Sequence, residues 1–304
     1  MNASPVHTSA APFQARDEQI LWRTTAFSCR TLTPCAVPTG PALLVLGGGL
    51  QTRHSWARLE QRLAPHHPVL IPELPPARPR GAPHLDWNDL TDAAVRTLDQ
   101  LGVAQTAVLG VSSGYPVAYR LAQRHPGRTS HLMLFGASPK PGPRLTALIQ
   151  EGLHHLHRTD PAAQARTHQA ERLVALLTNP AAAAHDLLMR AAAKVLLQHL
   201  LAAPHDPLKA YIRDRGALLL QQPLPYGGIS GVPALVGVGA YDTTTTVADN
   251  RAVAATIRGA TFAVFDNCDH LLHMERDADF ATLITRFLRS DPTALRGCTT
   301  EVLP

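Results

Sequence analysis

The sequence predicts an α/β fold: a mostly parallel central sheet flanked by helices, with a helical cap inserted between two of its strands. Two observations support this expectation. Apolar runs of strand length alternate with amphipathic helical patterns along most of the chain, as in parallel sheets that are covered on both faces. The alternation stops over residues 143–225, where leucines recur at helical spacing without β-branched runs, and it then resumes.

The chain before the insertion supplies the first strands. Residues 1–17 are polar and contain proline, so we expect a flexible arm, and one or two edge strands should follow between residues 19 and 35. Buried strands are expected at 41–46, 69–71, 107–111 and 131–135, helices at 56–63, at 86–101 and directly after 114, and an irregular Pro- and Arg-rich loop at 72–83.

The chain after the insertion repeats the strand and helix pattern twice. Strands at 233–238 and 261–265 are each followed by a helix, the second over 277–288. These expectations divide the chain into a flexible N-terminal arm (1–17), an α/β core (18–142 and 226–290), a helical cap (143–225) and a loosely held C-terminal tail (291–304).

The composition is that of a globular protein and argues against nucleic-acid binding. The 304 residues are 45% hydrophobic and 17% charged, with a net charge of +5. Arginines far outnumber the three lysines, Lys140, Lys194 and Lys209, but they are scattered and form no dense basic block. With abundant alanine, proline and leucine, this bias is typical of a GC-rich, bacterial genome, and we predict no nucleic-acid partner.

The sequence shows no sign of a membrane, targeting or metal-binding segment. No apolar run reaches the roughly 18 residues that a spanning helix needs, and the N-terminal residues lack the apolar core of a signal peptide. We expect a cytoplasmic protein without a membrane partner, and reduced thiols at Cys29, Cys35, Cys268 and Cys298. A solvated helix face is favoured over a metal site for His154, His155, His157 and His168, and we expect no metal or organic cofactor.

The candidate nucleophile lies in a strand, tight turn and helix. Gly110-Val111-Ser112-Ser113-Gly114 follows a strand-like apolar run, and apolar residues then recur at helical spacing. Such a turn lifts its serine out of the sheet on a strained backbone, and the glycines two before and two after it are needed because a Cβ there would collide with a neighbouring element. The pattern predicts that Ser112 is exposed as a nucleophile.

A base and an orienting acid follow in the chain. A serine hydroxyl is a poor nucleophile near neutral pH and needs a base within hydrogen-bond reach and a group that orients that base. Asp242 and His270 each come just after a predicted strand, and the carboxyl ends of parallel strands are where such sheets carry their sites. Nearby alternatives are Asp249, Asp266 and Asp269 for the acid and His273 for the base.

From about residue 41 to 288 the chain resembles the α/β-hydrolase-fold proteins that carry a helical cap. The resemblance is carried by the elbow at 110–114, by Gly239-Ala240-Tyr241-Asp242, and by Asp269-His270-Leu271-Leu272-His273-Met274-Glu275, since the family often has a glutamate five residues after its histidine. It implies a serine nucleophile at 112, a base at 270 and an orienting carboxylate at 242.

Two backbone amides are expected to stabilise the oxyanion. The amide of Ser113 follows the nucleophile at a helix N-terminus, where donors to a developing negative charge are already in place. The second donor should come from Gly47-Gly48-Gly49-Leu50, after the first buried strand. The resemblance favours the amide of Gly49, with that of Leu50 next.

The expected function is a serine hydrolase that cleaves an ester, thioester or lactone of a small or medium organic substrate through an acyl-enzyme on Ser112. Amide substrates fit the same chemistry, whereas dehalogenases and epoxide hydrolases of this fold use aspartate at the elbow. The alternatives are an acyltransferase, a cyclising enzyme or a lyase of the same fold, and a ligand-binding member without turnover. Differences from the common family pattern at Gly47, Tyr115 and 72–83 support this last alternative. The sequence leaves the substrate and the oligomeric state open.

Overall fold

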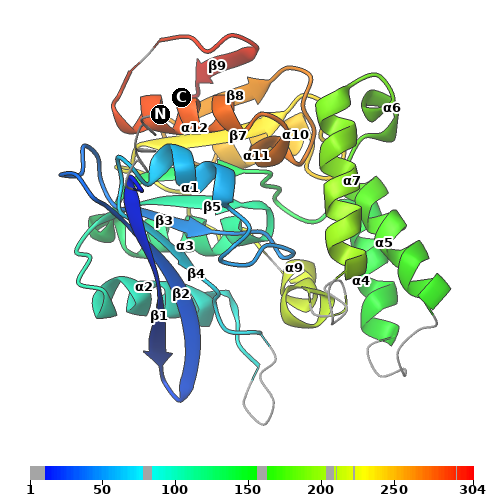
Figure 1. Ribbon diagram of the computed structural model, residues 1–304, viewed down its shortest axis with the longest axis horizontal. Coiled ribbons are helices and arrows are strands. Elements are labelled where there is room, and N and C mark those ends of the chain that lie inside the picture. The colour runs from blue at the N-terminus through cyan, green and yellow to red at the C-terminus, as the bar shows by residue number, and fades with distance from the viewer. Residues whose placement is uncertain are drawn as a thin grey trace, which may run out of the picture.

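The computed structural model of the protein describes residues 11–77, 84–155, 163–202, 209, 211–221, 223–291 and 293–304. Among these residues, nine strands form one sheet in the order β1-β2-β4-β3-β5-β6-β7-β8-β9 (Figure 1). The strands are β1 (Phe13–Trp22), β2 (Thr25–Pro34), β3 (Leu43–Leu46), β4 (Val69–Pro72), β5 (Thr106–Val111), β6 (Thr129–Phe135), β7 (Ala234–Gly239), β8 (Thr261–Phe265) and β9 (Cys298–Val302).

The six central strands are parallel, and the edges are antiparallel. β4, β3, β5, β6, β7 and β8 pair in parallel, whereas β1 with β2, β2 with β4, and β8 with β9 pair antiparallel. Every residue of β3, β5 and β7 is buried, as expected for strands that are covered on both faces. The predicted fold class, a mostly parallel sheet flanked by helices, is therefore confirmed.

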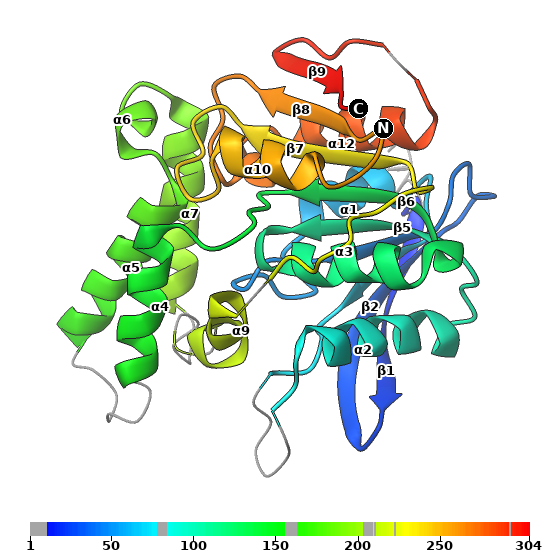
Figure 2. The same ribbon diagram turned by 180° about the vertical axis from the view of Figure 1, so that it is seen from behind.

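Helices cover both faces of the sheet (Figures 1 and 2). α1 (Ala57–Leu63) and α12 (Asp277–Leu288) pack against one face together with one hydrophobic cluster. α2 (Trp87–Gln100), α3 (Tyr115–Arg124) and α10 (Val247–Ala254) cover the other face and contribute to a second, larger cluster. Short 3-10 turns, η1 (Ser112–Gly114) and η2 (Pro126–Arg128), flank α3, and α11 (Leu272–Glu275) precedes α12.

The chain between β6 and β7, which we call the cap, consists of helices joined by turns and loops where the structure describes it. Its helices lie beside one end of the sheet (Figure 1). They are α4 (Pro143–His155), α5 (Ala163–Leu177), α6 (Pro180–Ala183), α7 (Leu187–Ala202), the π-helix η3 (Ile212–Gly216) and α9 (Ala217–Leu220). Leucines of α5, α7 and α9 belong to the larger hydrophobic cluster, so apolar packing joins the cap to the core.

Two expectations about the chain ends are wrong. The arm expected over 1–17 instead contains the start of β1, which is paired with β2 from Phe13 onward, and residues 1–10 lie outside the described residues. The tail expected to be loosely held forms β9, which pairs with β8 through Thr261↔Val302. Both errors have one cause: these strands are mostly exposed, so no strong apolar run marks them, and their partners stabilise them.

Further features of the described residues concern the cysteines, possible metal ligands and the length of the helices. The four cysteines are free thiols, and burial raises the pKa of Cys29 to about 12 and that of Cys298 to about 11. No group of three His, Cys, Asp or Glu side chains suited to a metal ion occurs in the described part of the chain; His157 lies outside it. Nor is any described helix long and apolar enough to cross a membrane.

Candidate active site

The turn after β5 presents Ser112 on a strained backbone. Ser112 has φ of 49°, in the left-handed region that non-glycine residues rarely adopt. The following 3-10 turn continues into α3, so the serine stands at the junction of strand and helix. This is the strand, tight turn and helix that the sequence predicts around Ser112, and the strained backbone is the kind that lifts a serine hydroxyl clear of a sheet.

The two glycines of this turn are explained by close approaches. A Cβ at Gly110 would lie 2.6 Å from the Ala118 Cβ on α3. A Cβ at Gly114 would lie 2.1 Å from the carbonyl oxygen of Leu46, at the end of β3. Backbone and buried helix atoms cannot yield by such amounts, so the turn can form only with glycine at both positions.

The structure brings Ser112, His270 and Asp242 into one hydrogen-bonded chain. The Ser112 Oγ lies 3.0 Å from the His270 Nε2, and the His270 Nδ1 lies 2.8 Å from the Asp242 Oδ2. Because a carboxylate only accepts, Nδ1 donates to Asp242 and Nε2 is left to accept the Ser112 hydroxyl proton. Three residues that are far apart in the sequence thus have the arrangement of a nucleophile, a base and an orienting acid.

The Asp242 carboxylate is held by a short threonine turn. Its Oδ1 accepts the amides of Thr244 and Thr245, each at 2.8 Å, and its Oδ2 accepts the Thr245 hydroxyl at 2.8 Å. The Asp242 side chain is only 1% exposed, so these donors replace the water that the carboxylate loses on burial. The other candidate acids serve elsewhere: Asp249 caps α10, and Asp269 accepts the amide of Asn179 in the cap.

Two opposing effects act on His270. Burial lowers its pKa, but the charge of Asp242, the hydrogen bond to it and the charge of Asp269 outweigh burial, so the pKa of His270 is raised above its ordinary 6.5. A base with such a pKa holds a proton more firmly than a free imidazole does. Only the neutral imidazole, which is present above that raised pKa, can accept the Ser112 hydroxyl proton.

The loop that carries His270 is secured by Glu275. The Glu275 Oε2 accepts the amide of Asp269 at 3.1 Å and the thiol of Cys268 at 3.2 Å. Burial, together with hydrogen bonding to and the charge of Asp269, raises the pKa of Glu275. The glutamate five residues after the histidine therefore stabilises the loop that carries His270.

The glycine loop after β3 approaches the same serine. A Cβ at Gly48 would lie 3.2 Å from the Ser112 Cβ, so the loop backbone passes directly beside Ser112. A Cβ at Gly49 would lie 1.8 Å from the ring of Tyr211, which the cap places against the loop. Gly49 and Ser113, the two predicted oxyanion donors, both line the cavity above Ser112.

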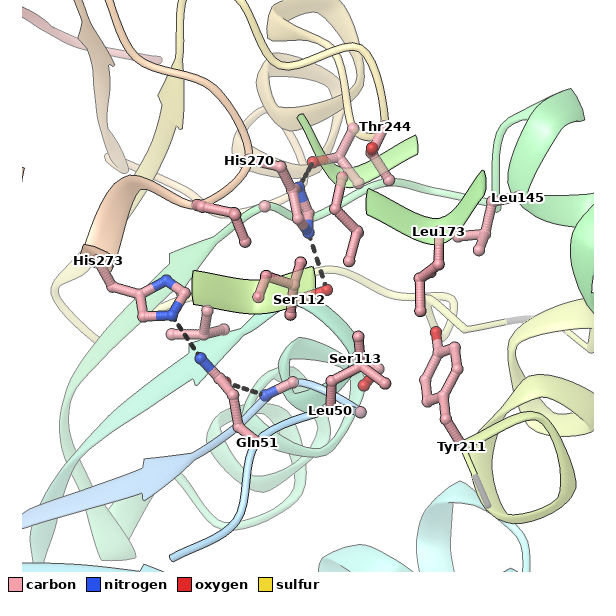
Figure 3. A pocket seen from close by; sticks show the side chains of 18 of the residues that line it. Leu50, Gln51, Ser112, Ser113, Leu145, Leu173, Tyr211, Thr244, His270 and His273 are labelled. Carbon is pink, nitrogen blue, oxygen red and sulfur yellow. Dashed lines mark hydrogen bonds between the residues drawn. The ribbon is translucent and has the colours of Figure 1, made fainter. Parts of the chain in front are cut away.

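A cavity of about 280 Å³ lies over the serine, between the carboxyl ends of the strands and the cap (Figure 3). Ser112, His270 and the glycine loop line it from the core. The cap contributes an apolar wall made of Leu145, Leu173, Leu177, Leu196, Tyr211 and Leu219. Such a cavity can hold an apolar group next to Ser112 and shield it from water.

Several residues of the site were not foreseen from the sequence. Thr245 supports Asp242, Tyr211 packs on the glycine loop, and Gln51 bonds to His273. The four successive threonines after Asp242 could have indicated that a threonine such as Thr245 supports this carboxylate. Gln51 and Tyr211 carried no signal, because their roles depend on contacts with distant segments.

Comparisons with known proteins agree with this architecture. The model of the alpha/beta hydrolase fold family matches residues 41–277. A putative carbamate hydrolase, RutD, from Caulobacter vibrioides is 27% identical over 135 residues, which are 41% of this chain and 48% of that protein. The chain thus spans about half the length of the curated relatives it matches.

Solved structures show the same fold at low identity. MGS-M2, an alpha/beta hydrolase enzyme from a Medee basin deep-sea metagenome library, aligns with a TM-score of 0.72 and 14% identity over 92% of this chain and 100% of that one. A thermophilic esterase from Thermogutta terrifontis aligns with a TM-score of 0.68 and 20% identity, again over 92% and 100%. Since the family model covers most of the chain, the protein belongs to the alpha/beta hydrolase fold family.

Proposed function

We propose that the protein is a serine hydrolase that cleaves an ester, thioester or lactone of a small or medium organic substrate through an acyl-enzyme on Ser112. The observation that carries the proposal is the continuous hydrogen-bonded chain from the Ser112 Oγ through His270 to Asp242, at the floor of an apolar cavity. Membership of the alpha/beta hydrolase fold family supports it, since enzymes such as MGS-M2 and the Thermogutta terrifontis esterase share this fold.

In the first step, Ser112 attacks the acyl carbon. The His270 Nε2 takes the hydroxyl proton as the Oγ–C bond forms, and the carbonyl π electrons move onto the oxygen. Asp242 stabilises the resulting imidazolium through Nδ1. When the tetrahedral intermediate collapses, the bond to the leaving alcohol or thiol breaks, and His270 Nε2 gives that group the proton.

The oxyanion needs donors that are already oriented, because reorienting them during the reaction would cost free energy. We assign this role to the amides of Ser113 and Gly49. Ser113 follows the nucleophile at the start of the turn into α3, and Gly49 lies on the loop that passes beside Ser112. The two amides come from different segments, and both residues line the cavity that Ser112 also lines.

In the second step, water releases the acid. Water loses a proton to the His270 Nε2 and attacks the acyl carbon, and the second tetrahedral intermediate then expels the Ser112 Oγ, which regains its proton from His270. Every proton passes through one nitrogen, and the enzyme returns to its starting state. The machinery uses only side chains and amides of this chain.

The cap wall favours an apolar acyl or alcohol group. Leucines supply most of the cap side of the cavity, and its volume of about 280 Å³ is at the lower end for a small-molecule site. We therefore propose short to medium aliphatic or aromatic esters as the first substrates to test.

The test is hydrolysis of a panel by the purified protein: p-nitrophenyl acetate, p-nitrophenyl butyrate, a butyryl thioester and a simple lactone. Ser112→Ala and His270→Ala should each lower kcat/KM by at least ~10³-fold, because each removes one member of a unit. Matched controls are Ser230→Ala and His84→Ala, which make the same changes at exposed positions and should retain full activity.

Two results would contradict the proposal. One is hydrolysis that persists unchanged in folded Ser112→Ala. The other is a folded native protein that cleaves no member of the panel, a result that would favour the ligand-binding alternative.

A further inference from the structure

We infer that Gln51 is a positioning residue that aligns the Gly49 amide for the oxyanion, and that its hydrogen bond to His273 ties this alignment to the loop carrying His270. This inference rests on the proposed function and extends it to a residue outside the serine, histidine and aspartate chain. Gln51 lines the cavity, and Figure 3 shows its side chain between the glycine loop and His273.

The hydrogen bonds of Gln51 fix the orientation of its side-chain amide. The Gly48 N–H lies 2.6 Å from the Gln51 Oε1, and a backbone N–H can only donate, so the oxygen of the amide must face Gly48. The Gln51 Nε2 then faces the His273 Nε2 at 2.6 Å and donates to it. His273 therefore carries its proton on Nδ1 and accepts at Nε2.

The backbone of Gln51 also binds the carbonyl group of Gly48. The Gln51 N–H donates to the Gly48 carbonyl oxygen at 3.1 Å, so both backbone polar groups of Gly48 are bound to one residue. The Gly48 carbonyl and the Gly49 N–H belong to the same planar trans peptide and point in opposite directions. Fixing the carbonyl therefore fixes the direction in which Gly49 donates. This contact comes from the Gln51 backbone, and the side-chain bond between the Gly48 N–H and the Gln51 Oε1 holds the turn in which it forms. Of these two bonds, Gln51→Leu removes only the side-chain bond.

The side chain of Gln51 packs where a side chain at position 47 would lie. A Cβ at Gly47 would come 3.2 Å from the Gln51 Oε1 and 3.1 Å from the ring of Trp56. The absence of a side chain at Gly47 thus makes room for Gln51. The glutamine takes up the space beside the loop and supplies the polar contact there.

His273 is a firm anchor for this contact. Its ring lies 5.3 Å from that of Trp56 and 6.5 Å from that of Phe280, measured between ring centroids. Burial and the nearby His270 lower the pKa of His273 to about 3, so its Nε2 stays unprotonated and able to accept at ordinary assay pH. His273 is three residues after His270, so the segment that carries the proposed base also binds Gln51 next to the glycine loop.

The test compares Gln51→Leu with Gln61→Leu, which makes the same change at an exposed position of α1. Each variant is assayed with p-nitrophenyl butyrate and titrated with butylboronic acid, which forms a tetrahedral adduct with a serine nucleophile. For Gln51→Leu we expect kcat to fall by ~10- to 100-fold with KM changed by less than ~3-fold. The boronic acid should bind weaker by about the same factor as kcat/KM falls, with a melting temperature close to that of the control.

A second variant keeps the inference testable if Gln51→Leu does not fold. His273→Phe retains the ring between Trp56 and Phe280 but removes the acceptor, and it should lower kcat and boronic acid affinity in the same direction. The Gln51→Leu, His273→Phe double variant should be no worse than Gln51→Leu alone, because the two residues act as a unit.

The outcomes separate this inference from the proposed function. A native protein that is active, with a folded Gln51→Leu as active as Gln61→Leu, contradicts the inference alone. Additive losses in the double variant contradict the coupling through His273. A native protein that neither hydrolyses the ester nor binds the boronic acid contradicts the proposed function as well.

Discussion

The floor of the cavity and its cap are held in place by different interactions. On the floor, Ser112, Asp242 and His270 follow parallel strands, and a continuous chain of hydrogen bonds orients their side chains. The cap side is mainly a wall of leucines on helices, held by packing that has little directional preference. We infer that the floor sets whether the reaction occurs and the cap sets which substrates fit, and mutations can test this division.

The largest effect is expected at the acid. Asp242→Asn keeps the shape of the side chain but removes the charge that stabilises the imidazolium, and it should lower kcat/KM by ~10³- to 10⁴-fold. Asp266→Asn, at an exposed position just after β8, is the matched control and should have no effect. Steady-state kinetics decide the matter, and a loss below ~10-fold for Asp242→Asn would place the orienting acid elsewhere.

Lowering the pH should reduce kcat/KM by protonating His270, without changing the apolar wall that the cap supplies. The base works only when neutral, and the pKa of His270 is raised above 6.5, so kcat/KM should fall about tenfold for each pH unit below that raised value. Activity is therefore present above the pKa of His270 and lost beneath it. A pH profile of kcat/KM with a pH-stable ester measures this limb, and a limb centred below 6.5 would contradict the assigned environment of His270.

The support of Asp242 should matter less than Asp242 itself. Thr245→Val removes the hydroxyl that donates to Asp242 Oδ2 while leaving the Thr245 amide in place, and we expect a loss of ~10-fold in kcat. Thr243→Val makes the same change at an exposed position of the same turn. Equal kcat values for the two variants would show that the backbone donors suffice.

The smallest effect on the chemical step is expected in the cap. Leu173 is 1% exposed and lines the cavity, so Leu173→Ala should enlarge the site, change KM for long against short acyl esters by ~3- to 10-fold, and leave kcat within ~3-fold. It should also destabilise the fold by roughly 2–3 kcal/mol through the cavity it creates. Leu188→Ala, at an exposed cap position, is the control. A large loss of kcat in Leu173→Ala would contradict the inference that the cap sets only which substrates fit.

The sequence predicts the floor better than the rest because its signals are local. Gly110 to Gly114 specifies the elbow within a few residues, and Asp242 and His270 follow apolar runs that mark their strands. The helix predicted at 277–288 coincides with α12 for the same reason: its apolar face repeats at helical spacing. These features need no knowledge of what packs against them.

Contacts between distant segments were out of reach of the sequence. Gln51 and His273 are 222 residues apart, and neither position carries a pattern that points to the other. The pairing of β9 with β8 and the packing of Tyr211 on Gly49 depend equally on the assembled fold. Part of the loop expected at 72–83, residues 78–83, lies outside the described residues.

The most direct measurement is the intact mass of the protein after treatment with a fluorophosphonate, which reacts with an activated serine. We predict a single adduct on the native protein, absent from Ser112→Ala, strongly slowed in His270→Ala, and unaffected by Ser230→Ala. No adduct on well-folded native protein, or an adduct that persists in Ser112→Ala, would contradict an activated nucleophile at Ser112.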